Sequence, residues 1–115
     1  MPDTSIFTRL KGVIEERKRH PATRSYTESL LAGGVDRIGH KILEEAQEVV
    51  EAAKETSAAR QSHVVHEAAD LVYHLFVLLG HCDVRLEMVE QELARRFGTS
   101  GLDEKAARKG SGAEK

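Results

Sequence analysis

The segment 60–81 constrains the fold most, because apolar side chains recur on almost every side of it at helical spacing. Its apolar members are Val64, Val65, Ala68, Ala69, Leu71, Val72, Leu75, Phe76, Leu78 and Leu79. A helix that is apolar nearly all round is expected at the centre of a domain. Two carboxylates, Glu67 and Asp70, nevertheless lie in its middle, and an unpaired charge among apolar groups loses its hydration at a large cost. Either the helix is less buried than its sequence indicates, or a positive partner lies beside these two side chains.

Helical periodicity extends to most of the remaining chain. Segment 6–19 has apolar residues at helical spacing with Asp3 or Thr4 as its N-cap, and segment 35–55 carries an apolar stripe flanked by charges. The pattern over 84–97 predicts a further helix. No segment shows the sustained period-two alternation of a half-buried strand. The predicted fold is therefore all-α, an antiparallel bundle of about four to five helices.

Two shorter segments have helix-capping patterns. Ser25 and Glu28 fit the capping box S-x-x-E, which begins a brief, loop-like helix that Gly33 and Gly34 end. Segment 100–108 begins with a similar cap and is predicted to dock as one or two turns.

Length and charge predict a single globular domain. A chain of 115 residues suits one core, so we expect a helical domain over 1–109 and a disordered tail over 110–115. The net charge of −2 gives no support for binding to nucleic acid or to an anionic membrane. No apolar run approaches the ~20 residues that span a bilayer. Because the N-terminus lacks a secretory pattern and the single Cys82 cannot form an internal disulfide, we expect a cytoplasmic protein.

Five carboxylates on two consecutive predicted helices form the pattern most indicative of chemistry. Glu44, Glu45 and Glu48 follow E-E-x-x-E, and Glu67 and Asp70 follow E-x-x-D in the next helix. Side chains three or four residues apart lie on the same face of a helix. The short connection between the two helices predicts antiparallel packing, which would bring the acidic pairs together.

Converging carboxylates need a cation. Two unit charges ~4 Å apart repel by roughly 4 kcal/mol at an effective dielectric constant of about 20, which is a large share of the free energy of folding. All-oxygen ligation selects a hard ion, Mg²⁺ or Mn²⁺, and such ions commonly bind substrate phosphates. The pattern therefore predicts metal-assisted attack of water on a phosphoanhydride.

Two competing interpretations stay open at this point. E-E-x-x-E is common in solvated helices that only exchange charge pairs with Lys and Arg. The segment from His66 to Asp70 also resembles the zinc motif H-E-x-x-H with Asp in place of the second histidine. No third zinc ligand stands out in a suitable context, although His74 and His81 lie on the same helix.

Several motifs together resemble the phosphoribosyl-ATP pyrophosphatase family, a branch of the MazG-like all-α nucleotide pyrophosphatases. They are Ser25-Tyr26-Thr27, Lys41 before EEAQE, EAADLVYHL from Glu67, and SGLDEK from Ser100. The resemblance covers roughly residues 6–109. It implies Mg²⁺-dependent hydrolysis of phosphoribosyl-ATP to phosphoribosyl-AMP and pyrophosphate, the second step of histidine biosynthesis, by a homodimer.

The resemblance also implies roles for individual residues. The metal ligands would be Glu45, Glu48, Glu67 and Asp70. Glu44 would be a further ligand or would orient the attacking water, and all five carboxylates are candidate catalytic residues. The candidate substrate-binding residues are Ser25, Tyr26, Lys41, Arg96, Lys105 and Arg108. Ser25 has a second role available as a helix cap, and each of the late basic residues has a solvated charge as its alternative.

Two other functions remain compatible with the sequence. A MazG-type pyrophosphatase acting on free nucleoside triphosphates would share the acidic pattern. A non-catalytic helical dimerisation module would need the apolar helix but no metal.

Overall fold

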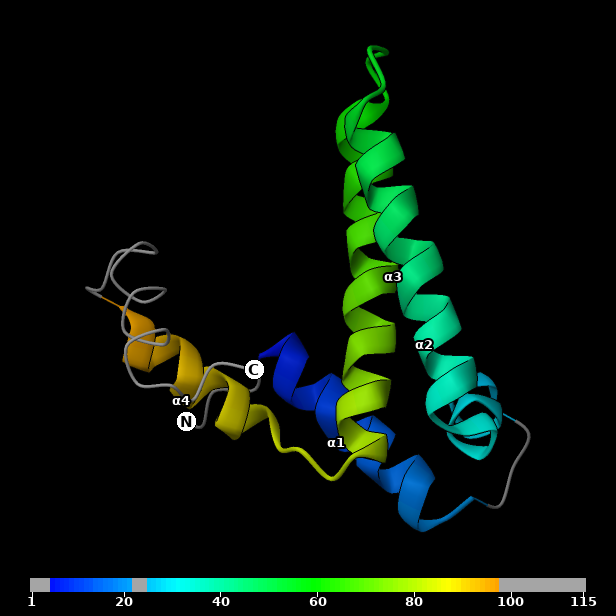
Figure 1. Ribbon diagram of the computed structural model, residues 1–115, viewed down its shortest axis with the longest axis vertical. Helices are drawn as coiled ribbons and strands as arrows, with labels where there is room; N and C mark the ends of the chain where they lie inside the picture. Colours follow the sequence, from blue (N-terminus) through cyan, green and yellow to red (C-terminus); the bar gives the residue numbers. More distant parts are fainter. Residues whose placement is uncertain (1–4, 22–24, 98–115) are drawn as a thin grey trace, which may run out of the picture.

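The structure, a computed structural model, describes residues 5–21 and 25–97, and every regular element within these ranges is a helix (Figure 1). The helices are α1 (Ile6–Arg19), α2 (Tyr26–Ala53), α3 (Arg60–His81) and α4 (Leu86–Arg96). The all-α prediction is confirmed. The predictions of docked turns over 100–108 and a tail over 110–115 fall outside the described residues.

The caps of the first two helices follow from their serines. Ser5 is the N-cap of α1, and its hydroxyl accepts a hydrogen bond from the Thr8 amide at 3.2 Å, so the prediction of Asp3 or Thr4 as the cap was wrong. Ser25 caps α2 as predicted, and its hydroxyl accepts from the Glu28 amide at 2.9 Å. Both hydroxyls satisfy an amide that has no partner within its helix.

Helix α2 contains the two segments that were predicted as separate helices. The interruption lies at Gly34, whose φ of 75° and ψ of −167° are accessible in practice only to glycine. The predicted break at this position is therefore present. The helix resumes at once on the other side, however, and the first segment is a regular helical arm rather than a loop.

A long antiparallel hairpin of α2 and α3 dominates the molecule, and α1 lies across its lower end (Figure 1). The core sits where the three helices meet and consists of Ile14, Leu30, Ile38, Phe76 and Val77. The approach of α1 to α3 is close, because a Cβ added at Gly80 would lie 2.9 Å from Ile14. Packing at this end holds the hairpin in place.

The outer part of the hairpin is apolar but only partly covered. Helix α3 packs against both α1 and α2, which confirms its central position. On α3, however, Val65 is 63% exposed and Leu75 is 42% exposed, while Leu43 and Val50 of α2 are 74% and 53% exposed. Of the two alternatives for α3, the one in which the helix is less buried than its sequence indicates therefore holds for the chain taken alone.

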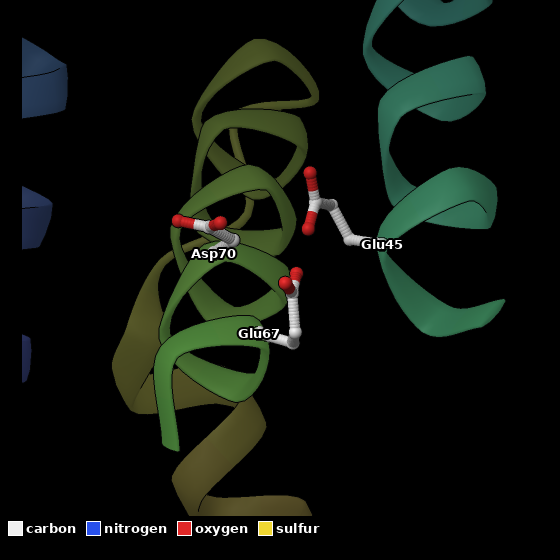
Figure 2. A group of neighbouring side chains, drawn as sticks. All are labelled: Glu45, Glu67 and Asp70. Atoms are coloured by element: carbon white, nitrogen blue, oxygen red, sulfur yellow. The ribbon is translucent and has the colours of Figure 1, made fainter. Parts of the chain in front are cut away.

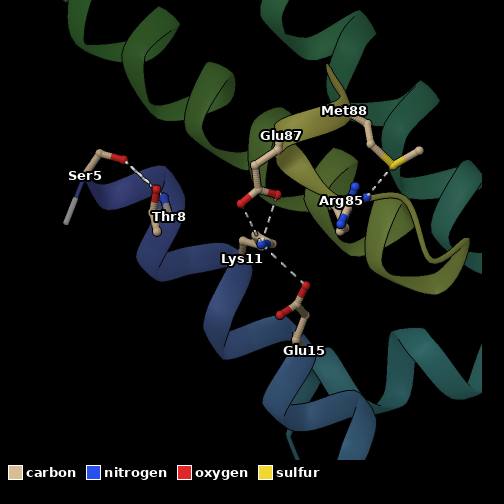
Figure 3. Close-up of polar contacts among 7 residues, drawn as sticks. All are labelled: Ser5, Thr8, Lys11, Glu15, Arg85, Glu87 and Met88. Atoms are coloured by element: carbon tan, nitrogen blue, oxygen red, sulfur yellow. Dashed lines mark hydrogen bonds and ion pairs between the residues drawn. The ribbon is translucent and has the colours of Figure 1, made fainter. Parts of the chain in front are cut away.

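Helix α4 leads away from the hairpin, and its first turn is tied to the rest by Leu86, which packs against the core, and by a polar contact of Glu87 (Figures 1 and 3). Lys11 of α1 donates to both carboxylate oxygens of Glu87 at 3.2 Å. At the N-terminus of α4 itself, the backbone amide of Arg85 donates to the Met88 sulfur at 3.4 Å. Helix α4 thus does not close the predicted bundle within one chain. Across the described ranges, no helix combines the length and apolarity needed to cross a membrane.

Candidate metal centre

Three carboxylates from the two hairpin helices converge. Oxygens of Glu45 on α2 and of Glu67 and Asp70 on α3 all lie within 4.8 Å of one another. Figure 2 shows Glu45 reaching from its helix toward the pair on α3. Glu67 and Asp70 share a face because they are three residues apart. In the described part of the chain, this is the only group of three or more potential metal ligands.

Glu45 occupies a position that would normally hold an apolar residue. It is 7% exposed and lies seven residues after Ile38 and seven before Ala52, both of which are buried. Residues seven apart on a helix point in nearly the same direction. The three side chains therefore form one seam facing α3, and the carboxylate is built into that seam.

Two carboxylate oxygens in this group have no protein partner. Oε1 of Glu45 and Oε1 of Glu67 are both buried and accept no hydrogen bond. Buried polar atoms are almost always satisfied, and a buried charge without a partner is costly. An all-oxygen donor set with two unsatisfied members fits a hard divalent cation such as Mg²⁺.

The electrostatics of the group point the same way. Burial, together with the negative charges of Glu48 and Asp70, raises the pKa of Glu45 to about 7. Hydrogen bonding to the Glu67 carboxyl, and burial, also raise the pKa of Glu48. A bound cation would reverse both effects, because it favours the ionised carboxylates.

Glu44 and Glu48 differ in their relation to this group. Glu48 lies outside the three converging residues but interacts with both Glu45 and Glu67. Glu44 is exposed and accepts a hydrogen bond from Lys41 at 2.9 Å. This contact lowers the pKa of Glu44, so its carboxyl is ionised at neutral pH. Lys41 thus contacts Glu44, which lies at the exposed edge of the acidic face of α2.

The zinc interpretation finds no support in this geometry. The His66 side chain is 72% exposed, and its Nε2 lies 3.4 Å from Asp70. No histidine belongs to the converging group found among the described residues. His66 is thus an exposed neighbour of Asp70 on the rim of the site.

The predicted substrate-binding residues are spread over the molecule. Ser25 caps α2, and the next residue, Tyr26, is 47% exposed with its hydroxyl 2.7 Å from His74 Nε2. Arg96 ends α4, which points away from the hairpin, and pairs with Glu92 at 3.0 Å. Lys105 and Arg108 lie outside the described residues.

Two hydrogen-bonded side-chain pairs beside the acidic group were not predicted as contacts. His74 contacts Tyr26, and Tyr73 hydrogen-bonds Thr27, so consecutive residues of α3 pair with consecutive residues at the start of α2. The sequence signal for His74 was its place four residues after Asp70, one helical turn away on the same face. Its partner, 48 residues earlier, gave no local signal.

Comparison with known proteins agrees with the geometry. The family model for phosphoribosyl-ATP pyrophosphohydrolase matches residues 7–97. A phosphoribosyl-ATP pyrophosphatase from Geotalea daltonii is 50% identical over 103 residues, covering 90% of this chain and 94% of that protein. Those from Rhodopirellula baltica and Nitrosospira multiformis are 45% and 48% identical over 109 residues, covering 94% and 95% of this chain and 91% and 88% of those proteins. The chain therefore belongs to the phosphoribosyl-ATP pyrophosphohydrolase family.

Proposed function

We propose that this protein hydrolyses phosphoribosyl-ATP to phosphoribosyl-AMP and pyrophosphate, the second step of histidine biosynthesis. The observation that carries the proposal is the pair of unsatisfied, buried carboxylate oxygens of Glu45 and Glu67 in the α2–α3 seam. The choice of phosphoribosyl-ATP as the substrate is supported by the relatives, which are named phosphoribosyl-ATP pyrophosphatase. A site of this kind attracts the cation that a polyphosphate substrate brings or requires.

The acidic residues would have two roles in the reaction, metal binding and activation of water. Glu45, Glu67 and Asp70, with Glu48 beside them, would hold Mg²⁺ or Mn²⁺. When bound, the ion neutralises charge on the phosphate oxygens. Glu44, ionised beside Lys41, would orient a water and take its proton. Water oxygen adds to the α-phosphorus, and the bridging oxygen leaves with pyrophosphate.

A substrate panel tests the function directly. Folded protein is incubated with Mg²⁺ and phosphoribosyl-ATP, ATP or dNTPs, and pyrophosphate release is measured. We expect rapid release from phosphoribosyl-ATP only. Strong preference for dNTPs would assign the chain to triphosphate housecleaning. Absence of release together with absence of saturable Mg²⁺ binding by calorimetry would identify a non-catalytic module.

We also propose that the working form is a homodimer. Leu43 and Val50 on α2, with Val65 and Leu75 on α3, leave apolar surface exposed on both helices of the hairpin. Large apolar side chains exposed on two packed helices are a feature expected of an interface. Multi-angle light scattering should give twice the mass of the 12.7 kDa chain, and a monomer mass would refute the proposal.

We propose that the protein acts in the cytoplasm. Its single Cys82 is exposed and has no second cysteine to pair with inside the chain, which suits a reducing compartment. Cell fractionation with an antibody to the protein checks this, and recovery in the membrane or secreted fraction would contradict it.

A further inference from the structure

The buried imidazole of His74 connects the acidic helix to the start of α2. His74 is 4% exposed. Its Nδ1 lies 2.8 Å from the backbone carbonyl oxygen of Asp70, and its Nε2 lies 2.7 Å from the Tyr26 hydroxyl. The Tyr26 and His74 rings also meet edge-on, with centroids 5.7 Å apart. One side chain thus ties Tyr26 to the backbone of a residue in the acidic group.

The two partners of His74 determine which way the hydrogen bonds run. A carbonyl oxygen can only accept, so Nδ1 carries the hydrogen and donates it to Asp70. In the neutral ring, Nε2 is then left as an acceptor, and the Tyr26 hydroxyl must donate to it. Burial raises the pKa of Tyr26, so its hydroxyl keeps the proton that it donates.

This direction restricts what Tyr26 can do for a ligand. Its only hydrogen is engaged with His74, and its oxygen keeps lone pairs that can accept. We propose that His74 is a positioning residue that makes Tyr26 a hydrogen-bond acceptor, which recognises a hydroxyl donor of the nucleotide and not a phosphate oxygen. This inference rests on the proposed function for the identity of the nucleotide.

Tyr26 is partly exposed and lies near charged residues of α2, one of which belongs to the acidic group. It is about half exposed, and the charges of Lys41, Arg37 and Glu45 all act on its hydroxyl. Arg37 and Lys41, the latter paired with Glu44, bring positive charge near Tyr26 that suits phosphate oxygens, so the site does not need Tyr26 for that purpose. The substrate hydroxyls nearest to the scissile phosphates are those of the ribose of the adenosine unit. We therefore assign Tyr26 to a hydroxyl of this ribose.

The tautomer can be tested on the protein without substrate, which separates this inference from the proposed activity. In ¹H–¹⁵N long-range NMR spectra at mildly alkaline pH, His74 should show a protonated Nδ1 and an unprotonated Nε2. Tyr26→Phe should shift the Nε2 signal most, because it removes only that hydrogen bond. Two protonated nitrogens, or a protonated Nε2 alone, would overturn the inference.

Two conservative substitutions each preserve one of the two hydrogen bonds of His74 and remove the other. In His74→Asn the amide nitrogen can replace Nδ1 as donor to Asp70, but nothing reaches Tyr26. In His74→Gln the amide oxygen can replace Nε2 as acceptor from Tyr26. We expect Tyr26→Phe and His74→Asn each to raise KM by about three- to tenfold with little change in kcat, and His74→Gln to retain most of the wild-type KM.

The double variant distinguishes positioning from a general structural role. If His74 acts through Tyr26, then Tyr26→Phe with His74→Asn should have the KM of Tyr26→Phe alone. Independent effects that multiply in the double variant would show that His74 only supports the fold. Thermal melts of all four variants identify any that fail to fold.

Phosphoribosyl adducts of 2′-deoxy-ATP and 3′-deoxy-ATP test whether Tyr26 accepts a hydrogen bond from a ribose hydroxyl, because each adduct lacks one of these hydroxyls. Wild-type protein should discriminate against one of them by about three- to tenfold in kcat/KM, and Tyr26→Phe should lose that discrimination. Equal use of both adducts and the parent by wild-type protein would refute the ribose contact. Discrimination that persists in Tyr26→Phe would do the same.

Discussion

At the scale of single residues, Glu45 is the least compatible with a simple helical hairpin. It takes a seam position between Ile38 and Ala52, and one of its oxygens has no partner. A buried carboxylate next to two others destabilises the metal-free fold unless it takes up a proton. Its pKa is raised to about 7 because burial and the neighbouring carboxylates disfavour its ionised form. A bound cation would offset the cost of burying this charge in the seam.

Replacing Glu45 by Gln should therefore separate stability from function. We expect Glu45→Gln to melt at a higher temperature than wild type in EDTA, because it removes one charge from the acidic group. Mg²⁺ should no longer raise its melting temperature, and turnover should fall by roughly 100-fold or more. Glu44→Gln, on the exposed side of the same helix, is the control and should keep the Mg²⁺-induced shift. A lower melting temperature for Glu45→Gln would indicate a purely structural carboxylate.

The pH dependence of stability follows from the same carboxyl. Its pKa is about 7 in the folded chain against an ordinary 4.5, so between these values the folded state binds more protons than the unfolded state. Stability contributed by the protonated group is present below pH 4.5 and is lost as pH rises through about 7. In EDTA, urea unfolding should show wild type losing stability over this range relative to Glu45→Gln. A constant difference between the two proteins would contradict the shifted pKa.

At the scale of elements, α2 depends on the interruption at Gly34. Gly33 and Gly34 allowed the break to be predicted, but its consequence was not predictable from local pattern. Whether a helix ends or resumes beyond a glycine depends on what the next turn packs against, and here Ile38 enters the core one turn later. The helical arm from Tyr26 to Gly33 can then contribute Leu30 to the core and Tyr26 to the site.

Gly34→Ala tests the conformation at this break. The φ of 75° with ψ of −167° is strained for any residue with a Cβ, so the substitution should destabilise the protein by about 1–3 kcal/mol. Gly39→Ala is the matched control, because Gly39 lies inside α2 and an added Cβ meets no atom within 4 Å. That control should be neutral or stabilising by up to ~1 kcal/mol. Equal effects in chemical denaturation would mean that α2 is continuous through Gly34.

At the scale of the whole molecule, the exposed side chains of the hairpin require a partner surface. Periodicity identified α3 as apolar on nearly all sides, but it could not tell burial within one chain from burial between chains. The same limit applies to α4, in which Met88 and Leu93 remain exposed, as does Phe97 directly after the helix. The sequence pattern thus predicted which helices form. It could not predict the contacts that form only when two chains associate.

Weakening the exposed stripe should dissociate the proposed dimer. Leu43→Gln combined with Val50→Gln removes two exposed apolar side chains from α2, each contributing about 1.5–3 kcal/mol if buried on association. Light scattering over a dilution series should show a monomer at concentrations where wild type remains a dimer. Glu51→Gln, an exposed change on the same helix, should leave the mass unchanged. Identical masses for all three proteins would remove this surface from the interface.

The acidic site shows how much of a functional centre local spacing can reveal. The convergence of Glu45, Glu67 and Asp70 was predictable, because three-residue spacing and a short connection restrict where the side chains can lie. The different environments of Glu44 and Glu45 depend on helix phase, which the seven-residue spacing of Ile38, Glu45 and Ala52 could have indicated. The contact of Tyr26 with His74 was not predictable, since it joins residues far apart in sequence through packing.

The most direct test of the central claim measures pyrophosphate release from phosphoribosyl-ATP as a function of Mg²⁺ concentration, with wild type, Glu45→Gln and Glu67→Gln assayed in parallel. We predict saturable, Mg²⁺-dependent release by wild type and a loss of roughly 100-fold or more in both variants, each folded by circular dichroism. Wild-type activity in either folded variant, or release that is independent of a divalent cation, would contradict a metal site built from these carboxylates.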